Sequence, residues 1–518
     1  MNMFSIEAAK LQKSVHTTSS FNEKNSRTPK IIMYVNEIIA LLFVAFNKKP
    51  YLCTRYINQS RTVMKKRLML TVAVAALLST AKAGGLMTNT NYHIAFDRMM
   101  ARGASFDIDA AFSNPAGLAW GYEGFQLSLN FQKPWQRRDI EANIPNYLAY
   151  PGVYQGYNGR SKFDGVASAP IVPALFATWR KDRIALSAMI GIVGSGGFVE
   201  YSDGIPMFNT LVMGSIFKQT LAAHMANPAS PVITPDMYTI DSNVKGKQYI
   251  YGGQLNVTYR ITDWLAAAVG VRANYYDGYS RAFVKATTIP QLGSQTLADL
   301  KLDCVQRGWG YTPIVSVDYH QGPLTLAARY EFRTKINTKN KTKDLPQGLG
   351  ELAAPYEDGN HVRYDMPALL SVAAGYEFSP KFRGTLEYHF FDDKHAKMSG
   401  DRQKTLKHGT HEFLAGVEGD VTDKLTLSCG VQRTDYGLTD DYQQNTSFAC
   451  DSYSIGLGAA VKLTEKIRLN AGYFISIYED YTKSSTKAEG GYMGTGYPGS
   501  ETYSRTNHVI GVGVDFKF

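Results

Sequence analysis

Hydrophobic and polar residues alternate with a period of two along most of the chain after about residue 122. The last segment, NHVIGVGVDFKF, is the clearest: the face from His508 to Phe518 is mostly apolar, and the face from Asn507 to Lys517 is small or charged. Segments 380–393 and 465–480 alternate in the same way. This period is typical of β-strands that have one apolar and one polar face.

Fourteen segments with this alternation can be counted, within the usual error of about two to four residues at each boundary. They are 123–133, 172–180, 183–201, 247–260, 263–279, 302–318, 322–334, 361–378, 380–393, 408–420, 422–436, 447–463, 465–480 and 503–518.

The connections between these segments alternate between short and long. Tight connections at Lys181-Asp182, Ile261-Thr262, 320–322, Ser379, Val421 and Thr464 are interleaved with longer polar ones, the longest being 134–171, 202–246, 335–360 and 481–502. Short turns at one end and long loops at the other are typical of barrels in the outer membrane. A secreted soluble all-β protein is the alternative, and it offers no reason for this sorting. We therefore predict an all-β fold, a transmembrane antiparallel β-barrel of about 14 strands with an N-terminal hatch (plug) segment in the lumen.

A secretory signal peptide is predicted at 64–83, in MKKRLMLTVAVAALLSTAKA. Lys65 to Arg67 form its charged region, an apolar run follows, and Ala81-Lys82-Ala83 forms a cleavage site that would leave Gly84 first. Residues 1–63 then form an upstream extension. We expect that translation begins at Met64; the alternative is an unusually long leader, removed in either case.

Charge argues against a nucleic-acid partner. The formal net charge is +10, but residues 1–83 hold 13 of the 55 basic and 3 of the 45 acidic residues, so the remainder has 42 of each. A neutral mature chain lacks the basic surface that nucleic acid binding requires. With a mean hydropathy of −0.23 and no apolar stretch of 18 residues, a bundle of membrane-spanning helices is also excluded.

The cysteines and catalytic motifs indicate neither a metal site nor an enzyme. Cys53 lies in the leader, and Cys304, Cys429 and Cys450 are scattered. Cys429 and Cys450 fall on opposite strand faces, so we predict free thiols. No spacing of Cys and His suggests a metal, no cofactor is expected, and no G-x-S-x-G motif is present.

Residues 84–121 lack the strand period and are the candidate for the hatch, followed by the barrel at 122–518. A lumen bounded by fourteen strands is too wide for wall side chains alone to fill. This segment has a short helical possibility at 94–101, a turn at Ser113 to Pro115, and apolar residues to bury. The alternative is a loose periplasmic tail.

The stretch Asp109 to Ala119, DAAFSNPAGLA, resembles the hatch signature of the FadL-type outer-membrane transporters of long-chain fatty acids and hydrocarbons. The family's Asn-Pro-Ala triplet corresponds here to Asn114, Pro115 and Ala116. The stretch 366–392, MPALLSVAAGYEFSPKFRGTLEYHFFD, is similar to the family's proline-led strand, short turn and aromatic-rich strand.

The resemblance implies a monomeric barrel with an N-terminal hatch, a hydrophobic binding site on the outer side, and lateral exit where the third strand kinks. Independently, the third predicted strand is interrupted by Gly191, Gly194, Gly196 and Gly197, and glycines inside a strand mark bulges or close approaches. The alternative is that these glycines merely pack against the hatch.

The expected function is uptake of hydrophobic small molecules, captured by the loops 134–171 and 202–246 and bound in an apolar lumen pocket. Candidate ligand-binding residues are the loop residues Phe208, Leu211, Met213 and Phe217 and the inward Arg272 and Arg383. The alternative for the apolar loop run is an amphipathic helix that caps the barrel, and the two roles could coincide. Inward cations, His389 included, are usually paired with a neighbour such as Glu387.

Two alternatives to transport stay open, and both are binding functions. One is an adhesion or receptor barrel, and the other is a haem receptor using His224 and His361. The expected partners are a hydrophobic ligand, outer-membrane lipid, and the barrel-assembly machinery through the C-terminal strand that ends in Phe518.

Overall fold

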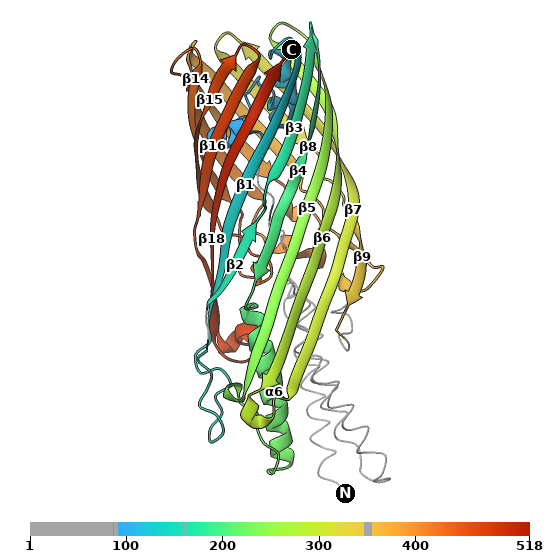
Figure 1. Ribbon diagram of the computed structural model, residues 1–518, viewed down its shortest axis with the longest axis vertical. Coiled ribbons are helices and arrows are strands. Elements are labelled where there is room, and N and C mark those ends of the chain that lie inside the picture. The colour runs from blue at the N-terminus through green and yellow to red at the C-terminus, as the bar shows by residue number, and fades with distance from the viewer. Residues whose placement is uncertain (1–85, 87–91, 160–161, 347–354) are drawn as a thin grey trace, which may run out of the picture. The chain divides into compact units, whose positions relative to one another are not determined.

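The computed structural model describes residues 86, 92–159, 162–346 and 355–518. The proposed upstream extension and signal peptide, with Cys53, therefore lie outside the described residues. In the described part, one antiparallel sheet of eighteen strand segments closes on itself, because β1 pairs with β18 on one side and with β2 and β3 on the other (Figure 1).

The eighteen segments form a closed barrel of fourteen strands, because four strands are each interrupted once. The interrupted strands are β2 with β3 (Lys162–Ser168, Val172–Lys181), β8 with β9 (Leu324–Glu331, Asn337–Asp344), β10 with β11 (His361–Arg363, Leu369–Ser379) and β16 with β17 (Ile467–Tyr478, Tyr481–Ser485). The continuous ones are β1 Gly124–Asn143, β4 Ile184–Tyr201, β5 Tyr238–Arg260, β6 Leu265–Thr288, β7 Thr296–Gln321, β12 Phe382–Phe391, β13 Thr410–Asp420, β14 Leu425–Asp435, β15 Ser452–Thr464 and β18 Gly499–Lys517. The predicted number of strands and the antiparallel barrel are confirmed.

The long loops are shorter in the structure than the sequence predicts. β1 continues to Asn143, β5 begins at Tyr238, and β2, β9 and β17 lie inside segments expected to be loops. These outer strand portions carry charged outward residues such as Arg137 and Glu141 instead of apolar ones. Apolar alternation therefore stops before the hydrogen-bonded ladder does.

The outer face of the barrel carries an apolar belt bordered by aromatic residues. On β7, Trp309 is 59% exposed at one border and Tyr319 lies ten positions further along the strand, with exposed valines between them. Ten residues at about 3.3 Å each, tilted by about 40°, span roughly 25 Å, the height of the apolar band of outer-membrane barrels. The belt thus matches the hydrocarbon layer of a bilayer.

The helices are few and lie at the N-terminus and in the outer connections. No helix in the described part has the length and apolar character to cross a bilayer. The α-helices are α4 Ile94–Arg98, α5 Ala110–Ser113 and α6 Pro206–Ala226, and the 3-10 helices are η1 Pro115–Ala119, η2 Pro235–Met237, η3 Pro290–Leu292, η5 Asp393–His395, η6 Ser399–Thr405, η7 Lys487–Glu489 and η8 Tyr492–Gly494.

The N-terminal segment, residues 92–121, packs against inward-facing residues of the wall. Its helix α4 lies against a row of wall glycines: a Cβ at Gly430 would come within 2.8 Å of the Met100 nitrogen, and one at Gly456 within 2.6 Å of the Asp97 oxygen. Arg98 of this helix pairs with Glu418 at 2.5 Å. The other glycines of the row, on β13, β15, β16 and β18, are Gly416, Gly458, Gly472, Gly511 and Gly513. Small wall residues therefore let this segment's backbone approach closely.

The three cysteines of the described part are free thiols, as predicted. Cys304 and Cys450 are buried, and Cys429 is exposed on the outer face of β14.

Candidate functional site

The wall is discontinuous between the second and third strands of the barrel. The pairing of β3 with β4 ends at Leu175 opposite Ile190, and the pairing of β2 with β4 begins at Ser168 opposite Phe198. In the part of the chain that the structure describes, no ladder pair of β2 or β3 with β4 falls between these two points. On its other side, β4 has two register shifts against β5, at 192–194 and 195–197. The sequence-predicted Gly191, Gly194, Gly196 and Gly197 all lie within this stretch, which is about 20 Å long at about 3.3 Å per residue.

Apolar side chains fill the lumen beside the discontinuity. Val172 and Ala174 come from one edge of it, Ile192 and Val193 from the other, and Phe112 from the N-terminal segment. We call this set the lumen cluster; its other members are Tyr92, Ile108, Ala110, Ala111, Leu118, Ala169, Phe176, Ala185, Met189, Ile250, Tyr276, Ile336, Val362, Tyr364 and Met366. An apolar surface inside the lumen therefore borders the part of the wall that has no ladder.

The Asn-Pro-Ala triplet is anchored to the wall beneath the lumen cluster by hydrogen bonds. Asn114 Nδ2 donates to Asp318 Oδ2 at 2.6 Å, and Trp120 Nε1 donates to the other oxygen of Asp318 at 2.7 Å. The Pro115 carbonyl accepts a hydrogen bond from Thr258 Oγ1 at 2.7 Å. The Ala116 nitrogen donates to the hydroxyl of a β7 serine at 3.0 Å. These hydrogen bonds hold the triplet and Trp120 against β5 and β7.

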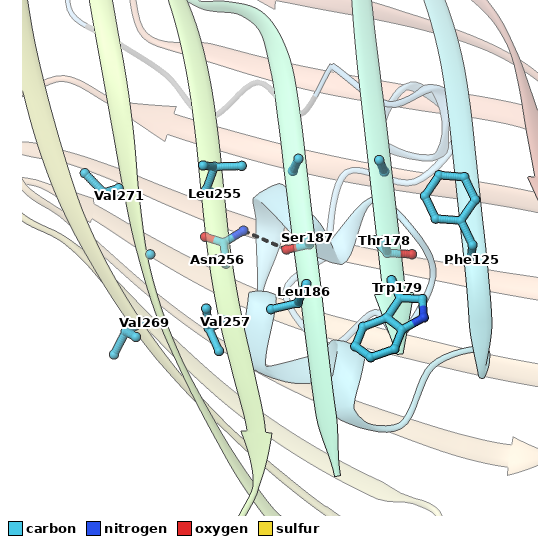
Figure 2. Close-up of a pocket in the computed structure, with 13 residues that line it drawn as sticks. Phe125, Thr178, Trp179, Leu186, Ser187, Leu255, Asn256, Val257, Val269 and Val271 are labelled. Carbon is cyan, nitrogen blue, oxygen red and sulfur yellow. Dashed lines mark hydrogen bonds between the residues drawn. The ribbon is translucent and has the colours of Figure 1, made fainter. Parts of the chain in front are cut away.

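An apolar groove of about 650 Å³ runs over the outer face of the same strands, close to the discontinuity (Figure 2). Leu186, Leu255, Val257 and Val271 border it, whereas Asn256 hydrogen-bonds Ser187 on the lumen side at 2.8 Å. The groove includes Ala177 and Ala188, which pair two positions from the last rung before the discontinuity. It offers an apolar path along the wall.

The four loop residues predicted to bind ligand lie on α6, away from the lumen cluster. Phe208, Met213 and Phe217 are buried, and Leu211 is partly buried, in a second apolar cluster that includes Ile140 and other residues of the outer strand portions. The run therefore forms a helix, which was the alternative for this segment, and most of its residues from Pro206 to Phe217 are buried. A small cavity of about 230 Å³ lies between its first turns and β1 and β2.

The inward arginines predicted as ligand candidates are both paired with carboxylates. Arg272 forms an ion pair with Glu331 and lies with its guanidinium carbon 5.4 Å from the centre of the Phe112 ring, beside the lumen cluster. Arg383 pairs with Glu418 near the turn end of the barrel. His389 contacts Glu387 at 2.6 Å, the pairing that the sequence suggested for inward cations.

The structure brings together two other arginines that the sequence reasoning missed. Arg138 on β1 and Arg505 on β18 are directly opposite in register, and no carboxylate of the described residues forms an ion pair with either. Arg138 donates to the Phe448 carbonyl at 2.7 Å, and the Arg505 Nε is buried without a hydrogen-bond partner in the described part. Their inward strand positions were the only available signal. Arg138 lies in the predicted loop 134–171, whereas Arg505 lies in the predicted strand 503–518.

Comparisons with known proteins bear on the fold. No family model matches the chain, and no curated protein matches it. A solved structure of a FadL homologue from Pseudomonas aeruginosa is similar with a TM-score of 0.55 and 16% identity, over 84% of this chain and 100% of the other. The toluene transporter TodX from P. putida (TM-score 0.48, 13% identity, 80% and 94% covered) and TbuX from Ralstonia pickettii (0.44, 16%, 80% and 94%) are more distant. The first similarity confirms, for the fold, the resemblance seen in the sequence.

Proposed function

We propose that this protein is a channel in the outer membrane of a Gram-negative bacterium that takes up hydrophobic small molecules, long-chain fatty acids or hydrocarbons. The observation that carries the proposal is the lumen cluster bordering the wall discontinuity. Apolar ligands bind in pockets lined by hydrophobic side chains with a few polar groups. A gap in the ladder beside these apolar side chains would give an apolar ligand an exit into lipid without crossing an aqueous lumen.

The proposed path begins at the outer connections and ends in the membrane. The α6 region and the connection after β1 capture the ligand, which moves to the lumen cluster above residues 92–121. This segment acts as a hatch: when the anchors of Asn114 on Asp318 are exchanged, the triplet moves and the space beside Phe112 enlarges. The ligand then leaves between β3 and β4 at Gly191 to Gly197 and follows the outer groove into the bilayer.

The fold supports this proposal over catalysis. The similar FadL homologue shares the barrel, although fold alone does not fix the cargo. The described residues contain no group of three metal-ligating side chains. We propose transport without a bound cofactor, by a single barrel acting as a monomer.

The test is mass spectrometry of small molecules extracted from protein purified from its native membrane in mild detergent. A co-purified fatty acid or hydrocarbon, with altered occupancy in a variant that replaces Asn114 to Ala116, is expected. A matched variant that replaces the exposed turn residues Thr422 to Lys424 should keep the native occupancy. A folded barrel that binds no apolar ligand, even from a range of added candidates, would refute the proposal.

The adhesion and haem-receptor alternatives are separate outcomes of the same experiment. His224 lies on α6, where its Nδ1 contacts the Ser230 carbonyl at 2.8 Å, whereas His361 is on the outer face of β10 beside Lys339. The two histidines belong to different surfaces, so no observation favours a shared iron. Haem in the extract would nevertheless favour the haem-receptor function over hydrocarbon uptake.

A further inference from the structure

A row of lysines stands on the outer face of the barrel wall on and just before β9. Lys335, Lys339, Lys341 and Lys343 are all exposed, and β9 alternates them with inward residues such as the buried Thr338. The strand reads KINTKNKTK, so the last three cations recur at every second position, about 7 Å apart. We call these four residues the lysine row.

The lysine row lacks counter-ions, whereas several other cations on the outer wall have them. Lys245 pairs with Glu200 at 2.8 Å, and Arg281 pairs with Asp303 at 2.9 Å. On the far side of the barrel, Arg433 pairs with a glutamate at 2.8 Å. In the described part of the chain, no carboxylate oxygen lies within 4.0 Å of a nitrogen of the lysine row.

Like charges also stand opposite one another at the row. Lys339 is directly opposite Arg307 of β7. Asp277, the acid beside Arg307, is shared between Arg307 at 2.9 Å and Lys247 at 2.5 Å. Like charges opposite each other weaken a sheet. These unpaired positive charges therefore do not stabilise the barrel.

The level of the row relative to the membrane identifies its partner. Arg307, opposite Lys339, lies two residues beyond Trp309, the aromatic border of the apolar belt. Aromatic borders lie at the level of lipid headgroups. The lysine row begins at this level and rises outward, so its first contact is with the headgroups of the outer leaflet.

We propose that the lysine row binds the phosphates of a multiply phosphorylated glycolipid of the outer leaflet. Three cations about 7 Å apart suit a headgroup that carries more than one phosphate, since Lys binds phosphate as a point charge. The inference rests on the outer-membrane placement in the proposed function, but not on hydrocarbon transport. The bound lipid supplies the counter-charge that the wall lacks and fixes lipid against β7 to β10.

The test uses the full protein in detergent with purified lipopolysaccharide as the probe, and native mass spectrometry to measure binding. The variant is Lys339→Gln, Lys341→Gln and Lys343→Gln together. Each lysine near an anionic lipid surface contributes about fivefold to binding. The triple variant should therefore bind on the order of 100-fold more weakly, and removal of the lipid phosphates should weaken binding to the native protein similarly.

The matched control changes three exposed lysines at the turn end of the barrel, Lys424→Gln, Lys462→Gln and Lys466→Gln, for the same loss of charge. It should bind lipopolysaccharide as the native protein does. Equal binding by both triple variants, or undiminished binding of the dephosphorylated lipid, would overturn the proposal. Gel migration with and without boiling verifies that each barrel is folded. Hydrocarbon binding should be unchanged in the β9 variant, which separates this proposal from the transport function.

Discussion

Asp318 joins the N-terminal segment to the barrel wall through both of its carboxyl oxygens, one to Asn114 and one to Trp120. The change Asp318→Asn keeps the shape of the side chain but replaces one carboxyl oxygen with an NH2 group. Either Asn114 Nδ2 or Trp120 Nε1 then loses its acceptor. A buried donor that is left without an acceptor costs about 1–3 kcal/mol. Because about 1.4 kcal/mol is a factor of ten in an equilibrium constant, local opening of this segment should become about 10- to 100-fold more frequent.

Amide hydrogen exchange followed by mass spectrometry measures this opening. Exchange of residues 110–120 should be faster in the variant by that factor, whereas α4, which has its own ion pair between Arg98 and Glu418, should exchange as before. Asp303→Asn, on the outer face of the same strand, is the matched control. The reasoning is refuted if residues 110–120 exchange at the native rate, or if the whole barrel exchanges faster in the Asp318 variant alone.

Three further predictions concern other parts of the molecule. Arg138→Gln with Arg505→Gln should raise the free energy of unfolding of the ligand-free protein by about 0.2–1 kcal/mol, because it removes opposed like charges. Two inward arginines without a carboxylate partner in the described part are suited to bind a ligand carboxylate, so the variant should weaken fatty acid binding while sparing a neutral hydrocarbon. Unchanged fatty acid binding in a titration would contradict this. Gly430→Ala should lower the free energy of local opening of the N-terminal segment by about 1–3 kcal/mol, measured by hydrogen exchange. Gly419→Ala, where the nearest atom to a new Cβ is 3.5 Å away, should not change it. Burial raises the pKa of Asp393, in the connection after β12, to about 7 from an ordinary 3.8. The protonated carboxyl therefore stabilises this connection fully below about pH 4, and the stabilisation is lost as the pH rises to about 7. Limited proteolysis of the connection should accelerate over this range, and Asp393→Asn should abolish the change.

The sequence alone predicted the wall well, because membrane strands must show one face to lipid. Ile510 and Val512 on β18 are 49% and 57% exposed, on the face that the alternation assigned to lipid, whereas Asp515 is buried on the other face. The position of the glycine-rich interruption on β4 was also readable, since glycines break the alternation. Both features are local in sequence.

The missed features depend on pairings between distant strands. Arg138 and Arg505 are 367 positions apart and meet only because β1 closes the barrel with β18. The partner of Asn114 likewise required the register of β7, which no local pattern specifies. The outer strand portions were missed for a different reason: above the apolar belt both faces are polar or mixed, so hydrogen bonding continues without a hydrophobic period.

The most direct test of the central claim is a disulfide across the wall discontinuity. A Cβ built at Gly191 lies 3.4 Å from the Ala174 Cβ, close to the usual Cβ separation of about 3.5–4.5 Å in disulfides. The pair Ala174→Cys and Gly191→Cys, in a background with Cys429→Ser, should therefore cross-link β3 to β4.

Uptake of a labelled hydrophobic ligand by cells that carry this variant is then measured before and after reduction. The account predicts that oxidation reduces uptake to the level of cells without the protein and that reduction restores it. The cross-linked pair Ala459→Cys and Ala471→Cys, directly opposite each other on β15 and β16 and away from the outer groove, should leave uptake unchanged. Full uptake through the oxidised Ala174–Gly191 cross-link would contradict lateral exit at this site.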